Sequence, residues 1–160
     1  MLILVSSRGG WSPLDFLMKY ISGTYRCAGS FRASRLDMEG LGSCQHVYIA
    51  QICQNPGISQ EGLAKRICVN KSTVTRQLGA LEQNGFVLRH PDPGDRRILR
   101  VYPTEKAKLA YPRVMELRAD WNRLLLEDFT PEERGALLHM LERIWRRAVR
   151  VTEGETAEKD

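Results

Sequence analysis

Closely spaced metal ligands are what this sequence of 160 residues most clearly lacks. It has three histidines and four cysteines, with no CxxC pair and no zinc-finger spacing. Structural zinc sites and disulfide-stapled domains both depend on such spacings. We therefore predict no metal and no cofactor, and we interpret the cysteines as reduced thiols of a cytoplasmic protein.

Long hydrophobic runs are also missing. The opening LILV is far too short for a signal-peptide core or for a membrane-spanning helix, which needs about 20 apolar residues. The length suits one domain, and no repeat or low-complexity segment is visible except the acidic, polar end EGETAEKD. We expect no membrane partner, a flexible lead-in over residues 1–11 and a flexible tail over residues 151–160.

Catalytic motifs are absent as well. The sequence contains no phosphate-binding glycine loop, no nucleophile elbow and no pair of carboxylates on one helical face. Cys44 and His46 are close in sequence, but side chains two positions apart on a helix point in different directions. Because a nucleophile and its base must lie within hydrogen-bond reach, we predict that the protein is not an enzyme.

What the sequence does have is a concentration of positive charge. Its net charge is +5 and its isoelectric point is about 9.2. Residues 59–103 hold eight Lys and Arg against four Asp and Glu, so most of the excess lies in one segment. A localised basic segment is typical of a protein that binds nucleic acid.

Residues 57–102 carry this charge, and their pattern predicts two short helices followed by a β-hairpin. Ser59 can cap a first helix that ends near Cys68, and Asn70 can cap a second helix that runs to about Gln83. Because so few residues separate the helices, the second must leave at a steep angle. This is the pattern of a helix-turn-helix.

The second helix has one apolar and one polar face. Val74, Leu78 and Leu81 predict the buried side, with Val69 filling the core from the turn and Asn84-Gly85 ending the helix. Short polar or cationic side chains occupy the other side, and these are Lys71, Ser72, Thr73, Thr75 and Arg76. Such side chains suit base edges in the major groove, although an ordinary solvated face has the same composition.

The hairpin favours the DNA-binding interpretation. Residues 86–90 and 98–102 are rich in β-forming side chains, and the tip PDPGDRR between them contains too much proline and glycine for a helix. Arg96 and Arg97 can enter a narrow minor groove, with Asp95 orienting a guanidinium through a bidentate bond. Alone, such a tip is more often a solubilising turn, but here it completes a winged unit.

Helices are predicted on both sides of this unit. An apolar helix over residues 12–38 contains Gly23 and Gly29, which favour either a bend or, as we prefer, close packing against another helix. A buried helix is expected over residues 43–54. Beyond the hairpin, Thr104 caps a long helix that Pro112 should kink unless the helix restarts there. A capping box at residues 130–133 begins the last helix.

The predicted fold class is mainly α with a small β-hairpin wing. A winged helix-turn-helix over residues 43–103 lies between helical regions at residues 12–38 and 104–150. The outer helices are apolar, but the winged unit closes on itself and leaves them no core to cover within the chain. We therefore expect them to interdigitate with a second subunit and to form a homodimer.

Several segments resemble a known family. The strings GISQEGLAKRI, NKSTVTRQLGALEQNGFVLR, PDPGDRR and VYPTEKAK look like the multiple-antibiotic-resistance regulator (MarR) family of bacterial transcription factors. The helical segments on either side fit the same architecture more loosely, so the resemblance covers most of residues 12–150. The resemblance implies a dimer on a pseudo-palindromic operator, usually a repressor that is released by a small phenolic ligand, an oxidant or a metal.

The predicted DNA contacts fall into three groups. Base edges would be read from the second helix by Ser72, Thr73 and Arg76, with Thr75 at the margin. Phosphates would be held by Lys65, Lys71 and Arg89. The flanking minor groove would be reached by Arg96 and Arg97, oriented by Asp95.

The resemblance also suggests where an effector would act. Relatives bind aromatic acids in the cleft between the dimer helices and the DNA-reading unit, and the candidates to line it are Tyr20, Arg26, His46, Tyr48 and Met115. Oxidant sensors of the family use a first-helix cysteine, which points to Cys27, although we favour a buried structural thiol.

Two further interpretations stay open. Zinc sensors of the family use histidines on the long helix after the wing, but that helix has none here and only His139 follows, so we do not expect their metal site. An oxidant- or metal-sensing regulator is one alternative. A winged-helix module that binds protein is the other, although its binding face would carry exposed aromatic or aliphatic side chains.

Overall fold

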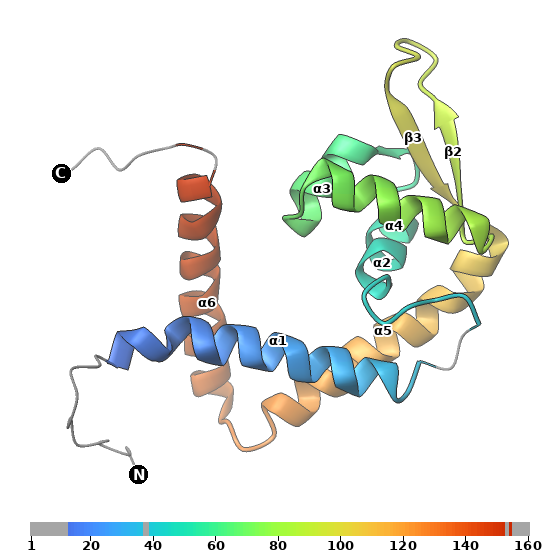
Figure 1. Cartoon of the computed structure of the whole chain (residues 1–160). Coiled ribbons are helices and arrows are strands. Elements are labelled where there is room, and N and C mark those ends of the chain that lie inside the picture. Colours follow the sequence, from blue (N-terminus) through green and yellow to red (C-terminus); the bar gives the residue numbers. More distant parts are fainter. Residues whose placement is uncertain (1–12, 37–38, 153, 155–160) are drawn as a thin grey trace.

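The computed structural model describes residues 13–36, 39–152 and 154 (Figure 1). A short 3-10 helix, η1 (Pro13–Phe16), leads into α1 (Leu17–Ala33), and α2 (His46–Gln54) follows after a loop. The long helices α5 (Glu105–Leu125) and α6 (Pro131–Thr152) lie after the hairpin. Between α2 and α5 lies the winged unit, built from β1 (Ile58–Ser59), α3 (Gln60–Ile67), α4 (Lys71–Gln83), β2 (Val87–Pro91) and β3 (Leu99–Pro103).

The predicted fold class is confirmed, with shifts at the ends of elements. The helix expected from residue 43 begins at His46, and α6 extends to Thr152, two residues into the segment predicted as a flexible tail. The lead-in at residues 1–11, the first residue of the helix predicted over residues 12–38, and residues 155–160 lie outside the described residues.

The sheet contains one strand that the sequence did not predict. The described strands pair antiparallel in the order β1-β3-β2, with Ile58 opposite Val101 on one side and Arg89 opposite Val101 on the other. β1 is only two residues long. Such a strand has no periodicity of its own and exists only through its pairing with β3, so the wing is anchored at its base to the start of α3.

The core of the winged unit surrounds α2, as predicted. Ile49 and Ile52 of α2 are fully buried against Leu63 of α3, Leu78 of α4 and Val101 of β3. The first half of α5 contributes Ala107, Ala110 and Val114 to the same cluster. The winged unit and the start of α5 therefore share one continuous core, which fixes α4 and the hairpin to a common base.

The helix caps that the sequence predicts at Ser59 and Thr130 are present. The hydroxyl of Ser59 accepts the amide of Gly62 at 3.0 Å. At the start of α6, Thr130 Oγ1 accepts the amide of Glu133 at 3.3 Å, and the Glu133 carboxylate accepts the amide of Thr130 at 2.8 Å. This reciprocal pair is a complete capping box.

Three predictions about packing need correction or qualification. Val69 does not fill the core but is 36% exposed, because Cys68 closes α3 in the left-handed conformation (φ 53°) and directs the chain outward. α1 continues past Gly23 and Gly29, and a Cβ at either position would meet nothing within 4 Å among the described residues. Among the described residues, α1 therefore has neither a break nor close packing at these two glycines. α5 runs through Pro112 without restarting.

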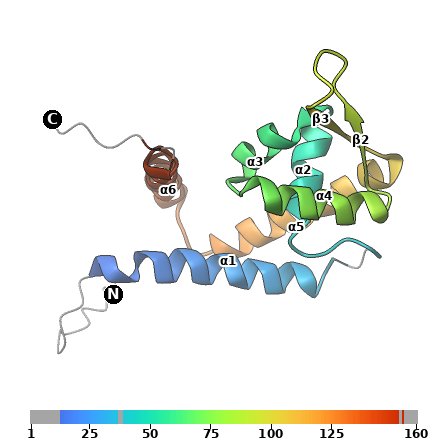
Figure 2. The ribbon, with the colours of Figure 1, turned by 45° about the horizontal axis from the view of Figure 1, so that its top comes forward.

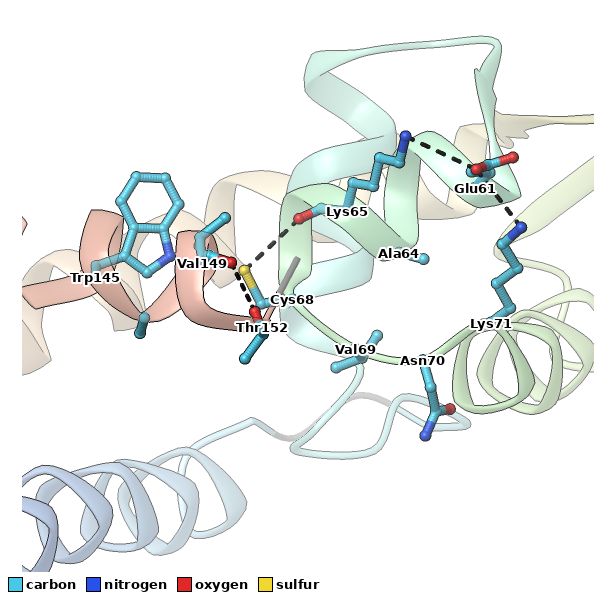
Figure 3. A pocket seen from close by; sticks show the side chains of 11 residues that line it. Glu61, Ala64, Lys65, Cys68, Val69, Asn70, Lys71, Trp145, Val149 and Thr152 are labelled. Atoms are coloured by element: carbon cyan, nitrogen blue, oxygen red, sulfur yellow. Dashed lines mark hydrogen bonds and ion pairs between the residues drawn. The ribbon is translucent and has the colours of Figure 1, made fainter. Parts of the chain in front are cut away.

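The last helix stands apart from the winged unit. In both Figure 1 and Figure 2, α6 follows the far end of α5 and stands away from the winged unit. No residue of α6 is buried. An open hollow of about 600 Å³ is lined by Trp145 and Val149 of α6 and by Lys65 and Cys68 of the winged unit (Figure 3). Among the described residues, the winged unit is therefore packed, whereas α6 is not.

Candidate nucleic-acid interface

The N-terminus of α4 is fixed by a single side chain. Asn70 Oδ1 accepts the amide of Thr73 at 2.8 Å and the hydroxyl of Ser72 at 2.9 Å. Asn70 was predicted to cap this helix, and the prediction is confirmed. The cap leaves the first turn of α4 exposed and uses the one proton of the Ser72 hydroxyl, so the oxygen of Ser72 can still accept a hydrogen bond from an outside donor.

The outer face of α4 is polar, as the helical period predicted. Lys71, Ser72, Thr75 and Arg76 are exposed, whereas Thr73 is half-buried. The Thr75 hydroxyl donates within the chain, lying 3.0 Å from the carbonyl of Lys71 and 3.3 Å from Gln60 Oε1. The Arg76 guanidinium makes no hydrogen bond or ion pair with the residues that the structure describes. Arg76 is therefore available for a base or a phosphate.

Two lysines flank one carboxylate beside α4. Glu61 Oε1 lies 3.8 Å from Lys65 Nζ and 3.5 Å from Lys71 Nζ, and all three side chains are more than half exposed. Ion pairs of this kind are screened by water and contribute little to stability. Both lysines can therefore turn toward phosphate without a large energetic penalty.

The wing tip carries the arginine clamp that the sequence predicted. Arg97 donates to Asp95 from Nε at 2.9 Å and from Nη2 at 2.8 Å, and its backbone amide donates to the same carboxylate at 3.0 Å. Arg97 is 89% exposed. The bond to the guanidinium lowers the pKa of Asp95 and raises that of Arg97. The arginine is thus held in one direction while its outer face stays open.

The structure brings the wing and the reading helix together. Lys71 and Thr75 of α4 line a hollow of about 290 Å³ with Arg97 and Ile98 of the wing and Gln60 of α3. Arg96 also lies on the exposed tip, and its side chain makes no hydrogen bond or ion pair within the described part of the chain. The hollow therefore brings together three of the predicted DNA contacts, Lys71, Thr75 and Arg97. We call the predicted contacts other than Arg89 the reading surface: Lys65, Lys71, Ser72, Thr73, Thr75, Arg76, Asp95, Arg96 and Arg97.

Arg89 does not join this surface. Its side chain is 22% exposed, and Nε and Nη2 of its guanidinium both donate to Oε2 of Glu82 on α4, while Glu82 Oε1 accepts the backbone amide of Arg89. These bonds lower the pKa of Glu82. Arg89 ties β2 to the end of α4, so its guanidinium is already engaged within the chain, and its phosphate contact stays a prediction.

Sequence reasoning missed a second ion pair at the base of the tip. Arg100 Nε donates to Asp92 Oδ2 at 2.6 Å, and Arg100 Nη1 donates to the carbonyl of Gly57 at 3.1 Å. Asp92 and Arg100 are eight residues apart and meet only because β2 and β3 pair in the observed register. Opposite charges at the two ends of the tip were the one available signal.

The predicted effector residues are scattered in the single chain. Tyr20 and Arg26 are exposed on α1, Tyr48 is buried in the core, and Met115 packs against that core. Four hollows found among the described residues are lined by other side chains. One chain does not assemble these residues into a pocket, so the effector site stays a prediction that requires a second subunit.

His46 is held in its neutral form. Its Nδ1 lies 2.8 Å from the carbonyl of Ser43. Burial, together with the positive charges of Arg32 and Arg118, lowers the pKa of His46 from 6.5 to about 4. A neutral, half-buried imidazole near pH 7 matches the predicted core or pocket histidine.

Cys27 is the residue predicted as a possible oxidant sensor. Cys27 is exposed on α1 rather than buried as we favoured, because none of the described residues covers that side of α1. The described residues include no group of three or more His, Cys, Asp or Glu placed to hold a metal ion.

None of the described helices is both long and apolar enough to cross a membrane.

Comparisons with known proteins agree with this geometry. The profile of the MarR family matches residues 43–99. YybA, an uncharacterized HTH-type transcriptional regulator of Bacillus subtilis, is 36% identical over 100 residues, which covers 62% of this chain and 67% of YybA. In this and two further curated relatives the match covers between 52% and 67% of the relative's own length.

Solved structures match over most of the chain. The crystal structure of the transcriptional regulator SlyA has a TM-score of 0.82 at 29% identity, covering 85% of this chain and 96% of the other. A crystal structure of MarR has a TM-score of 0.76 at 30% identity, covering 91% of this chain and 99% of the other. The chain therefore belongs to the MarR family of transcriptional regulators.

Proposed function

We propose that this protein is a homodimeric regulator that binds a pseudo-palindromic DNA operator in the cytoplasm. The hollow in which Lys71 and Thr75 of α4 meet Arg97 of the wing carries the proposal. It combines a polar helix suited to the major groove with an exposed, oriented arginine suited to the minor groove. The excess positive charge of residues 59–103 supports the same partner.

Arg76 is the strongest candidate for reading a base. Its guanidinium is unengaged within the described chain, and a guanidinium can grip guanine through two bonds. Ser72 and Thr73 lie in the first turn of α4, where recognition helices contact base edges. Lys65 and Lys71 would hold phosphates, and Arg96 and Arg97 would reach the flanking minor groove.

A second copy of the chain would cover the outer helices. Trp145 is 55% exposed and Leu138 is 59% exposed, although both belong to the apolar stripe of α6. Burying such side chains is favourable by about 1.5–3 kcal/mol each, and no element of the described chain does so. The open space beside Gly23 and Gly29 on α1 would admit a helix of the partner.

The dimer would set the spacing of two reading surfaces. Two α4 helices related by a two-fold axis would enter successive major grooves with centres about 10 base pairs apart. A bound dimer would cover both half-sites and would repress a promoter that overlaps them. An effector, aromatic by family resemblance, that changes the angle of the dimer helices would shift the two α4 helices and release one half-site. Its cleft would form from Tyr20, Arg26, His46, Tyr48 and Met115 of both subunits.

The proposal is tested by selecting bound duplexes from a random DNA pool at near-physiological salt. We expect an inverted repeat whose half-sites are about 10 base pairs apart. Recovery of unrelated sequences whose binding disappears with added salt would contradict the proposed operator. In that case a winged-helix module for protein partners would explain the chain better.

A further inference from the structure

We propose that Asp92 and Arg100 form a brace that positions the minor-groove arginine, Arg97, at a fixed distance from α4. The brace rests on the proposed function, because it specifies how the wing reaches DNA. Neither Asp92 nor Arg100 contacts DNA in this account. Both are positioning residues that act through the clamp between Asp95 and Arg97.

Asp92 organises the inside of the wing tip. Its Oδ1 accepts the backbone amides of Gly94 at 2.8 Å and Asp95 at 3.1 Å, and its own amide donates to the carbonyl of Ile98 at 2.8 Å. These bonds hold the tip from both ends. Because Asp95 in turn grips the Arg97 guanidinium, the orientation of Arg97 depends on the carboxylate of Asp92.

Arg100 connects this tip to the body of the winged unit. Its Nε donates to Asp92 Oδ2 at 2.6 Å, while Nη1 of the same guanidinium donates to the carbonyl of Gly57 at 3.1 Å. Gly57 lies in the turn after α2, and its amide donates to the carbonyl of Val101 at 2.8 Å. One planar guanidinium therefore joins the wing tip to the turn that leads into β1 and α3.

The low solvent exposure of Asp92 favours positioning over direct contact. The side chain of Asp92 is only 16% exposed, that of Arg100 is 40% exposed, and that of Arg97 is 89% exposed. The bonds from Arg100, Gly94 and Asp95 lower the pKa of Asp92, so the carboxylate stays charged at neutral pH. A negative charge beside a DNA-binding tip opposes phosphate by simple electrostatics. The presence of the Asp92 carboxylate at the wing tip is explained if this carboxylate fixes the conformation of the tip.

The consequence for binding is geometric. Arg97 and α4 border the same hollow, so the tilt of the wing sets the separation between the group in the minor groove and the helix in the major groove. A tip that moves relative to α4 would lose orientational entropy on binding and weaken the complex. The expected loss is about tenfold and does not exceed the loss from removing Arg97 itself.

The decisive variant is Asp92→Asn, because the brace and a purely electrostatic effect predict opposite changes in DNA affinity. Removing a negative charge near DNA should tighten binding if only charge matters, whereas loss of the brace should weaken it about tenfold. Affinity is measured on a duplex that the wild-type protein recovers from the random pool. Glu61→Gln is the matched control, since it removes an exposed acid near Lys65 and Lys71 outside the brace, and its binding should tighten or stay unchanged.

Arg100→Lys tests the same brace without changing the charge. Lysine cannot bond Asp92 and the Gly57 carbonyl with one planar group, so specific binding should weaken while its salt dependence stays the same. Arg146→Lys, in an exposed ion pair on α6, is the control for this exchange. In a variant that also carries Arg97→Ala, Arg100→Lys should add almost nothing, because the brace acts through Arg97.

Three outcomes would overturn the inference. Tighter or equal binding by Asp92→Asn would exclude the brace, and full additivity of Arg100→Lys with Arg97→Ala would make Arg100 an independent contact. The third outcome needs no DNA: the Nε–H signal of Arg97 in isotope-labelled protein should be sharp in the wild type and broadened in Asp92→Asn. An unchanged signal would refute the brace even if the pool selection fails, and a failed selection by itself would refute only the proposed function.

Discussion

The winged unit and the last helix differ in how far they bury their apolar side chains. The winged unit buries Val74, Leu78 and Leu81 of α4 completely against α2, α3 and the sheet. α6 has an equally apolar stripe, but none of its residues is buried. Similar hydrophobic patterns are thus buried in α4 and exposed in α6, because only α4 has packing partners close to it in the sequence.

This difference shows which part of the function each region can perform alone. The winged unit positions its own reading surface through contacts within one chain, including the Asn70 cap and the Asp95–Arg97 clamp. The spacing between two such surfaces requires an interface that a single chain does not contain. Local affinity and long-range specificity therefore depend on separate sets of residues, which mutations can separate.

The largest expected effect comes from Leu141→Glu on α6. A carboxylate on the apolar stripe should prevent dimerisation, because a buried unpaired charge is strongly unfavourable. Affinity for a two-half-site duplex should fall about thousandfold as the second contact is lost, while circular dichroism stays unchanged. Sedimentation at micromolar concentration checks the mass. His139→Glu, on the polar face of the same helix, should remain dimeric, and a monomer there would contradict this assignment.

Leu78→Ala should reduce the stability of the winged unit rather than prevent dimerisation. It removes a fully buried side chain from the winged unit and should lower the free energy of unfolding by about 3 kcal/mol. Denaturant titration at two protein concentrations measures the change. The loss should be the same at both concentrations, because Leu78 lies in the core of one chain. A strongly concentration-dependent loss would show that this core is coupled to the interface.

These predictions depend on features that differ in how visible they are in the sequence. Ser59, Asn70 and Thr130 were recognised as caps because capping involves residues only two or three positions apart. The Asp95–Arg97 clamp was predictable for the same reason. The Asp92–Arg100 brace was missed because it depends on strand register, and β1 was missed because pairing alone defines it.

Burial by distant elements was the least predictable feature. Val69 was expected in the core and is exposed, since the conformation of Cys68 decides the direction of the chain there. Gly23 and Gly29 were expected to pack closely and face open space. The effector residues on α1 and α2 remain unassembled. Each of these expectations concerned contacts that a helical or strand period does not specify.

A smaller effect is expected from Arg76→Ala. Losing one guanidinium from the reading surface should cost about 2 kcal/mol on the selected duplex and relax preference at one base position. Repeating the pool selection with the variant identifies that position. Arg66→Ala, which removes an exposed arginine of α3, is a charge-matched control. Equal loss on selected and random duplexes would contradict a base-reading role for Arg76.

The smallest effect at neutral pH concerns His46, whose contribution changes only as the pH falls. The pKa of His46 is lowered from 6.5 to about 4 in the folded chain, so the unfolded chain binds more protons between these values. Its contribution to stability is complete above pH 6.5 and is lost as pH falls toward 4. His46→Gln should reduce the slope of unfolding free energy in this window by at most about 1.4 kcal/mol per pH unit. An identical slope in both proteins would exclude this linkage.

The central claim is that rigid outer helices hold two reading surfaces at a fixed separation. It is tested most directly by inserting about five base pairs between the half-sites of the selected duplex, which rotates one half-site to the opposite face of the DNA. We predict that the wild-type dimer loses most of its affinity, about hundredfold, because only one surface can then bind. Undiminished affinity for the lengthened duplex would contradict the claim and would mean that the two surfaces act independently.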